Sequence, residues 1–152
     1  HTARWPILVG CSLGGPIAAR LAALHPDQVA GLIIVAGSLD PALEEPGFAQ
    51  WLATSALVRF LLPQVLDNSM GELDAAKRET KLLAQELRKV TCPVIVIHGT
   101  TDELVPYANV AYLKKMLFNA RSVRVMTLNG QGHFVPWEKP EEIRNAVREM
   151  AR

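Results

Sequence analysis

Short apolar runs alternate with longer stretches of helical spacing along most of this chain. The runs are rich in β-branched residues and bounded by turn residues, which is typical of buried strands. They predict strands at 5–9, 31–35, 93–98 and 122–128. The longer stretches predict helices at 13–24, 106–118 and 140–151. Because strands and helices alternate, we expect an α/β fold with a mostly parallel sheet and helices on its faces.

The alternation is interrupted by an insert at about 40–89. Its segment 48–62 is strongly apolar and includes Trp51 and Phe60. We interpret this segment as a short helical cap over a ligand site, with a helix buried in the core as the alternative. A second helical face, which most simply packs on the sheet, is formed by Leu73, Thr80, Leu83, Leu87 and Val90. The chain is expected to form one domain, 1–152, that carries this insert.

The most informative motif is Gly10-Cys11-Ser12-Leu13-Gly14, directly after the first expected strand and before an alanine-rich helix. A Gly-x-Ser-x-Gly in this context is typical of a nucleophile elbow, a tight turn that exposes a serine above the sheet. We expect both glycines to be required because a Cβ would clash with neighbouring backbone. The Leu13 N–H would point toward an oxyanion, assisted by the helix dipole. The alternative is a glycine-rich turn that binds an anion or simply packs tightly.

A serine nucleophile needs a base, and the base needs an acid that fixes its tautomer. Asp102 directly follows the strand expected at 93–98, and His133 lies in a glycine-rich loop after the strand at 122–128. Ligands bind at the carboxyl edge of an open α/β sheet, so Ser12, Asp102 and His133 are expected to converge there. The chain order Ser, Asp, His is that of α/β-hydrolases and differs from the chymotrypsin and subtilisin orders.

At these motifs the chain resembles the α/β-hydrolase superfamily and its serine esterases and lipases. The stretches that carry the resemblance are 10–15, 99–106 and 132–137, and 139–143 is similar to the start of the family's last helix. The resemblance covers nearly the whole chain apart from its middle. It implies a partial α/β-hydrolase fold with a cap, and catalytic roles for Ser12, Asp102 and His133, but it is unspecific for the substrate.

Hydrolases of this family usually place several strands and helices before the elbow, and one of the upstream loops supplies a second oxyanion N–H. The resemblance therefore implies that the chain is the carboxyl-terminal portion of a longer hydrolase and is catalytically poor alone. The strand at 5–9 would then become a sheet edge, although its apolar run is typical of a central strand. Because an apolar edge invites pairing, we expect dimerisation or aggregation through this strand.

Each candidate residue also has an alternative interpretation. Asp102 could cap the helix expected near Pro106, and His133 could be an exposed loop residue. Asp40 competes for the acid role, because it follows the strand at 31–35 and some members of the superfamily take their acid from that strand. We prefer Asp102, whose local sequence matches the commoner pattern. The other histidines are interpreted as structural and are His1, His25 and His98.

Composition and charge argue against several classes of partner and cofactor. The net charge is +1 and no basic stripe is present, which argues against a nucleic-acid partner. No apolar run reaches membrane-spanning length, and 48–62 lacks the basic polar face of a helix that binds lipid. The two cysteines provide no disulfide framework, and no histidine pair has metal-ligand spacing, so neither metal nor other cofactor is expected. We expect a cytoplasmic protein; a signal peptide stays open, because the chain begins at His1 rather than at methionine.

We therefore expect a serine hydrolase that cleaves a carboxylic ester or thioester of small to medium size through an acyl-enzyme. The apolar insert favours an apolar acyl or alcohol group. The residues expected to contact this substrate are Cys11, Trp51, Phe60, Val105 and Phe134. Cys11 also has the character of a small packing residue. The alternatives are a carbon–carbon bond hydrolase, an acyltransferase, or a non-catalytic ligand-binding protein or inactive fragment.

Overall fold

The computed structural model describes residues 5–43 and 82–152. Within them, four parallel strands form one sheet in the order β1-β2-β3-β4. They are β1 (Ile7–Cys11), β2 (Gly31–Val35), β3 (Val94–Gly99) and β4 (Val123–Leu128). The α-helices include α1 (Gly14–Leu24), α5 (Asn109–Met116), α6 (Val135–Glu138) and α7 (Pro140–Met150), and the short 3-10 helices are η1 (Pro26–Gln28) and η2 (Leu87–Lys89). Residues 82–86, directly before η2, are also α-helical. The expected α/β fold with a parallel sheet and flanking helices is confirmed.

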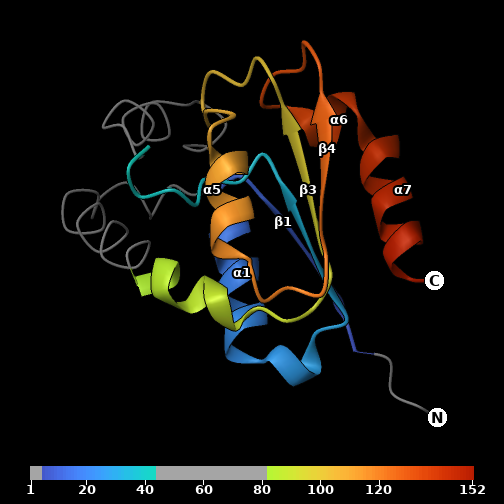
Figure 1. Cartoon of the computed structure of the whole chain (residues 1–152). Coiled ribbons are helices and arrows are strands. Elements are labelled where there is room, and N and C mark those ends of the chain that lie inside the picture. The colour runs from blue at the N-terminus through green and yellow to red at the C-terminus, as the bar shows by residue number, and fades with distance from the viewer. Residues whose placement is uncertain (1–4, 44–81) are drawn as a thin grey trace, which may run out of the picture.

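Helices cover both faces of the sheet. The helices α1 and α5 lie on one face and α7 lies on the other (Figure 1). The inner strands β2 and β3 therefore bury the side chains of both faces, and every one of their residues is buried. This explains why both strands are continuous apolar runs rather than alternating patterns.

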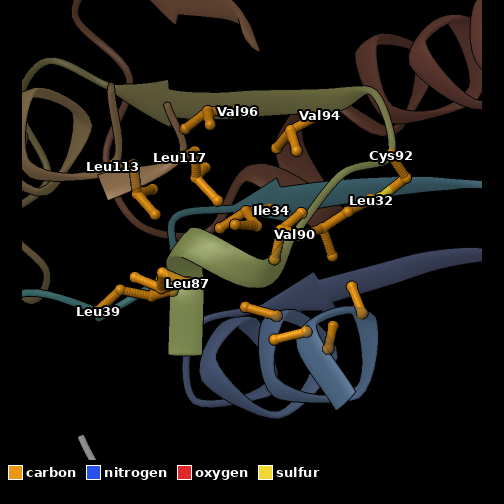
Figure 2. Close-up of a cluster of buried hydrophobic side chains, with 14 of the residues drawn as sticks. Leu32, Ile34, Leu39, Leu87, Val90, Cys92, Val94, Val96, Leu113 and Leu117 are labelled. Atoms are coloured by element: carbon orange, nitrogen blue, oxygen red, sulfur yellow. The ribbon is translucent and has the colours of Figure 1, made fainter. Parts of the chain in front are cut away.

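The larger core cluster lies between the sheet and the helices α1 and α5 (Figure 2). Alternate strand residues enter it, and they include Leu32, Ile34, Val94 and Val96. Opposite them, α1 presents small side chains that let the helix approach the sheet closely, namely Ala18, Ala19, Ala22 and Ala23. The intervening strand residues face α6 and α7, in a second cluster of Ile33, Val35, Ile95, Ile97, Val135 and Ala146. Each fully buried leucine, isoleucine or valine stabilises the fold by about 1.5–3 kcal/mol.

The strands begin and end within two residues of the expected positions, but one helix differs more. The helix expected from Pro106 begins at Asn109 instead. The residues before it form a turn, in which the Asn109 backbone N–H and side-chain Nδ2 both donate to the Pro106 carbonyl at 3.0 Å. The four-residue α6 was not expected, because so short a segment shows no helical periodicity.

Only the last part of the expected insert lies within the described residues. There Leu83, Leu87 and Val90 are buried in the core cluster of Figure 2, as their helical spacing predicts. The segment 48–62, with Trp51 and Phe60, lies outside the described residues, so the cap stays a prediction. None of the helices in 5–43 and 82–152 is long and apolar enough to cross a bilayer.

One edge of the sheet is apolar and exposed. Among the described residues β1 pairs only with β2, and Val9 on β1 is 48% exposed. The helix α1, which packs on this strand, exposes Ile17, Leu21 and Leu24. Their spacing of four and three residues places them on one face of the helix. An apolar edge strand beside an apolar helix face can pair with another chain.

We expect the 152-residue chain to self-associate through β1. A Val9→Lys substitution should shift it toward monomer, because a charged side chain on an edge strand opposes pairing. Size-exclusion chromatography with light scattering, over a range of protein concentrations, measures the shift. The matched control is Phe118→Lys, which changes an exposed apolar residue outside this edge. A wild-type chain that stays monomeric at every concentration would contradict the expectation.

Candidate active site

The turn between β1 and α1 holds Ser12 in a left-handed conformation, with φ at 52°. Such a conformation costs about 1–2 kcal/mol for a residue with a side chain. Two backbone hydrogen bonds hold it: the Ser12 N–H donates to the Val35 carbonyl at 3.0 Å, and the Ser12 carbonyl accepts from the Gly15 N–H at 3.0 Å. The turn is therefore fixed both to the neighbouring strand and to the first turn of the helix.

The glycines of this turn differ in the space that a Cβ would find at each position. A Cβ at Gly10 would lie 2.3 Å from the Gly14 carbonyl oxygen, so glycine is required there, as expected. At Gly14 a Cβ would meet nothing within 4 Å, so the expected clash at this position is wrong. The carbonyl of Gly14, and not its Cα, makes the close approach. Gly15 is the second tight position, because a Cβ there would lie 3.1 Å from the Cα of Gly37.

Asp102 lies in the loop after β3, and its two carboxylate oxygens have different partners. Oδ1 accepts from the backbone N–H of Leu104 at 3.0 Å and of Val105 at 2.8 Å. Oδ2 lies 2.8 Å from Nδ1 of His133. Asp102 therefore stabilises its own turn with one oxygen and holds a histidine with the other.

The loop that carries His133 is tied to the loop that carries Asp102. The Thr100 N–H donates to the Leu128 carbonyl at 3.0 Å, and the Thr101 N–H donates to the Gln131 carbonyl at 3.1 Å. The Gly130 N–H donates to the Thr100 hydroxyl at 2.9 Å. The contact is so close that a Cβ at Gly99 would lie 2.1 Å from the Gln131 carbonyl oxygen. The two loops therefore form one rigid unit.

Ser12, His133 and Asp102 lie in one hydrogen-bonded line. The Ser12 Oγ is 3.0 Å from Nε2 of His133, whose Nδ1 contacts Asp102. An ionised carboxylate only accepts hydrogen bonds, so Nδ1 carries the proton and Nε2 is left as an acceptor for the Ser12 hydroxyl. Both His133 and Asp102 are buried. This arrangement can take a proton from a serine hydroxyl and return it to another group.

The carboxyl of Asp102 is held in its ionised form. Burial alone would raise its pKa, but hydrogen bonds from His133, His98 and the Val105 N–H outweigh burial and hold the pKa well below its usual range. Asp102 is therefore ionised at neutral pH. A charged partner at Nδ1 also favours the positive form that the histidine adopts when it accepts a proton at Nε2.

This lowered pKa has a consequence for stability. Asp102 stabilises the folded chain fully above about pH 5, and the contribution is lost as pH falls through the lowered pKa. Urea unfolding of wild type and of Asp102→Asn should therefore give a difference in unfolding free energy that is smaller at about pH 3 than at about pH 5. The matched control, Asp27→Asn, changes an exposed carboxyl. A difference that widens from about pH 5 to about pH 3 would refute the expectation.

Asp40, the competing acid, is engaged elsewhere. Its Oδ1 accepts from the Ala42 N–H at 2.9 Å, and its backbone N–H donates to Oδ1 of Asn109 at 2.9 Å. Asn109 is fully buried and also accepts from the Leu39 N–H at 2.9 Å. The loop after β2 is thus fixed to the start of α5 through one asparagine, which the sequence pattern did not single out.

The residues expected to bind the oxyanion or the substrate around Ser12, His133 and Asp102 have different environments. Leu13 directly precedes α1, so its N–H belongs to the unpaired donors at a helix start. Cys11 is half-buried against the second core cluster, and burial, with the Asp102 charge, raises the pKa of its thiol. Phe134 is 43% exposed and contacts the His133 ring edge-on at 6.0 Å between centroids. Val105 is 1% exposed, which argues against the expected substrate contact by its side chain. Its backbone contacts Asp102 instead.

His98 is the residue near the line that sequence reasoning underestimated. It was expected only to end a strand, but it is fully buried, and its Nε2 lies 3.5 Å from Oδ2 of Asp102. The signal was present in the sequence: a polar ring inside a fully buried strand must find a partner, and Asp102 follows four residues later. His25 is exposed at the end of α1, as expected. Within the described residues, no group of three or more histidine, cysteine, aspartate or glutamate side chains could hold a metal ion.

Among the known proteins to which this chain is similar are esterases and lipases. The chain is 30% identical, over 151 residues, to a pimeloyl-[acyl-carrier protein] methyl ester esterase from Aeromonas hydrophila. The solved structure of a monoacylglycerol lipase from Paleococcus ferrophilus is similar with a TM-score of 0.67 and 22% identity, covering 96% of this chain and 67% of that one. A structure from the metagenome-derived lipolytic enzymes LipS and LipT gives a TM-score of 0.71 at 16% identity, covering 97% and 65%. At these two identities the likeness concerns the fold alone.

The match to the Aeromonas esterase covers 76% of this chain and 59% of that protein. The chain therefore spans less than two thirds of the length of this relative. The sequence model of the alpha/beta hydrolase family matches residues 3–146, which include both loops and the β1–α1 turn. The chain belongs to the α/β hydrolase family.

Proposed function

We propose that this protein is a serine hydrolase that cleaves a carboxylic ester or thioester, with Ser12 as nucleophile, His133 as base and Asp102 as the acid that orients it. The hydrogen-bonded line from Asp102 through His133 to Ser12, at 2.8 and 3.0 Å, carries the proposal. The strained backbone of Ser12 supports it, because such strain concentrates at functional sites. The order of the three residues along the chain is that of α/β-hydrolases.

In each half of the proposed reaction His133 acts first as a base and then as an acid. Ser12 Oγ attacks the carbonyl carbon while Nε2 of His133 takes its proton. The oxyanion is stabilised by the Leu13 N–H and the positive end of α1. The carbon–oxygen or carbon–sulfur bond then breaks, and His133 protonates the departing alcohol or thiol. Water, deprotonated by His133, then attacks the acyl carbon; the bond to the Ser12 Oγ breaks, and His133 returns the proton to Oγ as the acid is released.

The substrate class rests on the relatives and on the apolar residues near His133. The Aeromonas relative is named for a methyl ester, and the Paleococcus neighbour for a monoacylglycerol. Beside His133, Phe134 and Trp137 expose 43% and 69% of their surface and contact each other edge-on. Such aromatic surface favours an apolar acyl or alcohol group of small to medium size.

A fluorophosphonate probe tests the proposal, because it reacts only with an activated serine. We expect stoichiometric labelling of the full chain on Ser12, identified by peptide mass spectrometry, and loss of the label in Ser12→Ala. The matched control, Ser122→Ala, changes an exposed serine just before β4 and should keep the label. Absence of label from wild type would instead support a non-catalytic binding protein or an inactive fragment.

Labelling of Ser12 does not show which bond of the substrate the enzyme cleaves. Turnover of matched esters, thioesters and β-diketones separates ester, thioester and carbon–carbon cleavage, and an added alcohol acceptor reports acyl transfer. We expect ester or thioester turnover to exceed the other activities, because the attacked carbonyl then carries a leaving group that needs only one proton from His133. Faster carbon–carbon cleavage or acyl transfer would replace this part of the proposal.

A further inference from the structure

His98 is a fully buried polar residue at the carboxyl end of β3. Its Nε2 lies 2.9 Å from the Val105 carbonyl oxygen and 3.5 Å from Oδ2 of Asp102. A carbonyl oxygen only accepts hydrogen bonds, so Nε2 carries a proton and donates it. The same N–H therefore faces both the loop backbone and the acid.

Val105 links His98 to the other side of the carboxylate. The Val105 carbonyl accepts from His98, and the Val105 N–H donates to Oδ1 of Asp102 at 2.8 Å. Pro106 follows and limits Val105 to extended backbone. Holding the Val105 carbonyl therefore also holds its N–H, and with it the direction in which Asp102 presents Oδ2 to His133.

The His98 ring is fixed from the side as well. The ring of Tyr107 meets it edge-on, with centroids 5.8 Å apart and planes at 87°. The Tyr107 hydroxyl is in turn 2.6 Å from the Thr127 hydroxyl oxygen on β4. This packing sets the plane of the imidazole and hence the direction of its Nε2–H.

The arrangement leaves one polar atom unpaired. Among the described residues Nδ1 of His98 is buried without a hydrogen-bond partner, a condition that destabilises a folded protein. The rest of β3 is apolar, and a leucine at position 98 would avoid this penalty. What histidine provides here and leucine could not are the contacts of its Nε2–H with the Val105 carbonyl and Asp102.

We propose that His98 is a positioning residue for the acid, acting on Asp102 through the Val105 carbonyl and the longer contact to Oδ2. The inference rests on the proposed function, in which Asp102 orients His133. His98 touches no reacting atom; it holds the loop 99–105 so that one carboxylate oxygen stays aligned with Nδ1 of His133.

Two amide substitutions at His98 separate a positioning role of its Nε2–H from a general need for a polar side chain at this position. In His98→Gln the side-chain nitrogen can occupy the place of Nε2, whereas in His98→Asn it reaches only the place of Nδ1. We expect His98→Asn and His98→Leu to lower kcat by about 10- to 100-fold with KM unchanged, and His98→Gln to recover most of the loss. Rates are counted per molecule labelled by fluorophosphonate at completion, so a misfolded fraction does not enter. Equal rates in the Gln and Asn variants would overturn the proposal.

A second measurement does not depend on activity. The proton between His133 Nδ1 and Asp102 should give the most downfield resonance in the proton NMR spectrum, assigned by its loss in Asp102→Asn. We expect it to persist in His98→Gln and to move upfield or broaden in His98→Asn. An unchanged resonance in both variants would overturn the positioning role even if wild type proved not to be an esterase. A wild type that keeps this behaviour but shows no turnover would refute the proposed function alone.

Discussion

Replacing Ser12 with alanine should lower turnover of a short p-nitrophenyl ester by about a millionfold in the full-length protein, because the three residues of the line act as one unit. Without Oγ, His133 has no proton to take and the acyl-enzyme cannot form. The remaining rate would come from oxyanion donors and substrate binding acting on a water molecule. Initial rates with purified wild type and variant, at substrate concentrations well below KM, measure the effect.

Two controls make that result specific. Ser122→Ala should leave turnover close to wild type, since the exposed Ser122 precedes the amino end of β4. Alanine keeps the Cβ and the left-handed backbone of position 12 and loses only the hydrogen bond from Oγ to His133, so thermal unfolding of the variant should occur near the wild-type temperature. A Ser12→Ala protein that retained most of its esterase activity would refute the assignment of the nucleophile.

Much of the fold could be predicted because burial imposes a simple pattern. The strands β2 and β3 are buried on both faces, and an unbroken run of β-branched residues satisfies that environment. Parallel strands also bring their carboxyl ends to one edge, so candidate residues after three separate strands were expected to meet. The three residues do meet: His133 lies within hydrogen-bond distance of both Ser12 and Asp102.

What could not be predicted depends on tertiary contacts. Nothing local distinguishes Gly10 from Gly14, but only a Cβ at Gly10 would collide with backbone. The helix α5 begins late because Asn109 bonds back to the Pro106 carbonyl. Val105 was expected to contact the substrate, whereas the fold buries its side chain and its backbone N–H donates to Asp102.

Asp102 shows how one residue can stabilise a turn and hold a histidine at the same time. The alternative interpretation, that it only stabilises a turn, accounts for Oδ1, which two backbone N–H groups occupy. It does not account for Oδ2, which faces His133. The two roles reinforce each other, since the turn that Oδ1 stabilises is what fixes the position of Oδ2.

This division of roles makes Asp102→Asn the second substitution with a large expected effect, a loss of about 10⁴ in kcat with the fold intact. The amide oxygen should take the place of Oδ1, where the N–H groups of Leu104 and Val105 need an acceptor. The amide NH₂ must then face Nδ1 of His133 as a donor. The histidine is forced to carry its proton on Nε2, where it can no longer accept the proton of Ser12.

The comparison with Asp40→Asn decides between the two acids. Asp40 bonds to its own turn and to Asn109, so its substitution should change kcat little. Steady-state kinetics of both variants, each checked for an unchanged circular dichroism spectrum, gives the answer. The expected order is wild type close to Asp40→Asn, with Asp102→Asn far below both. The reverse order would transfer the acid role to Asp40, and with it the loop after β2 would become the one that orients His133.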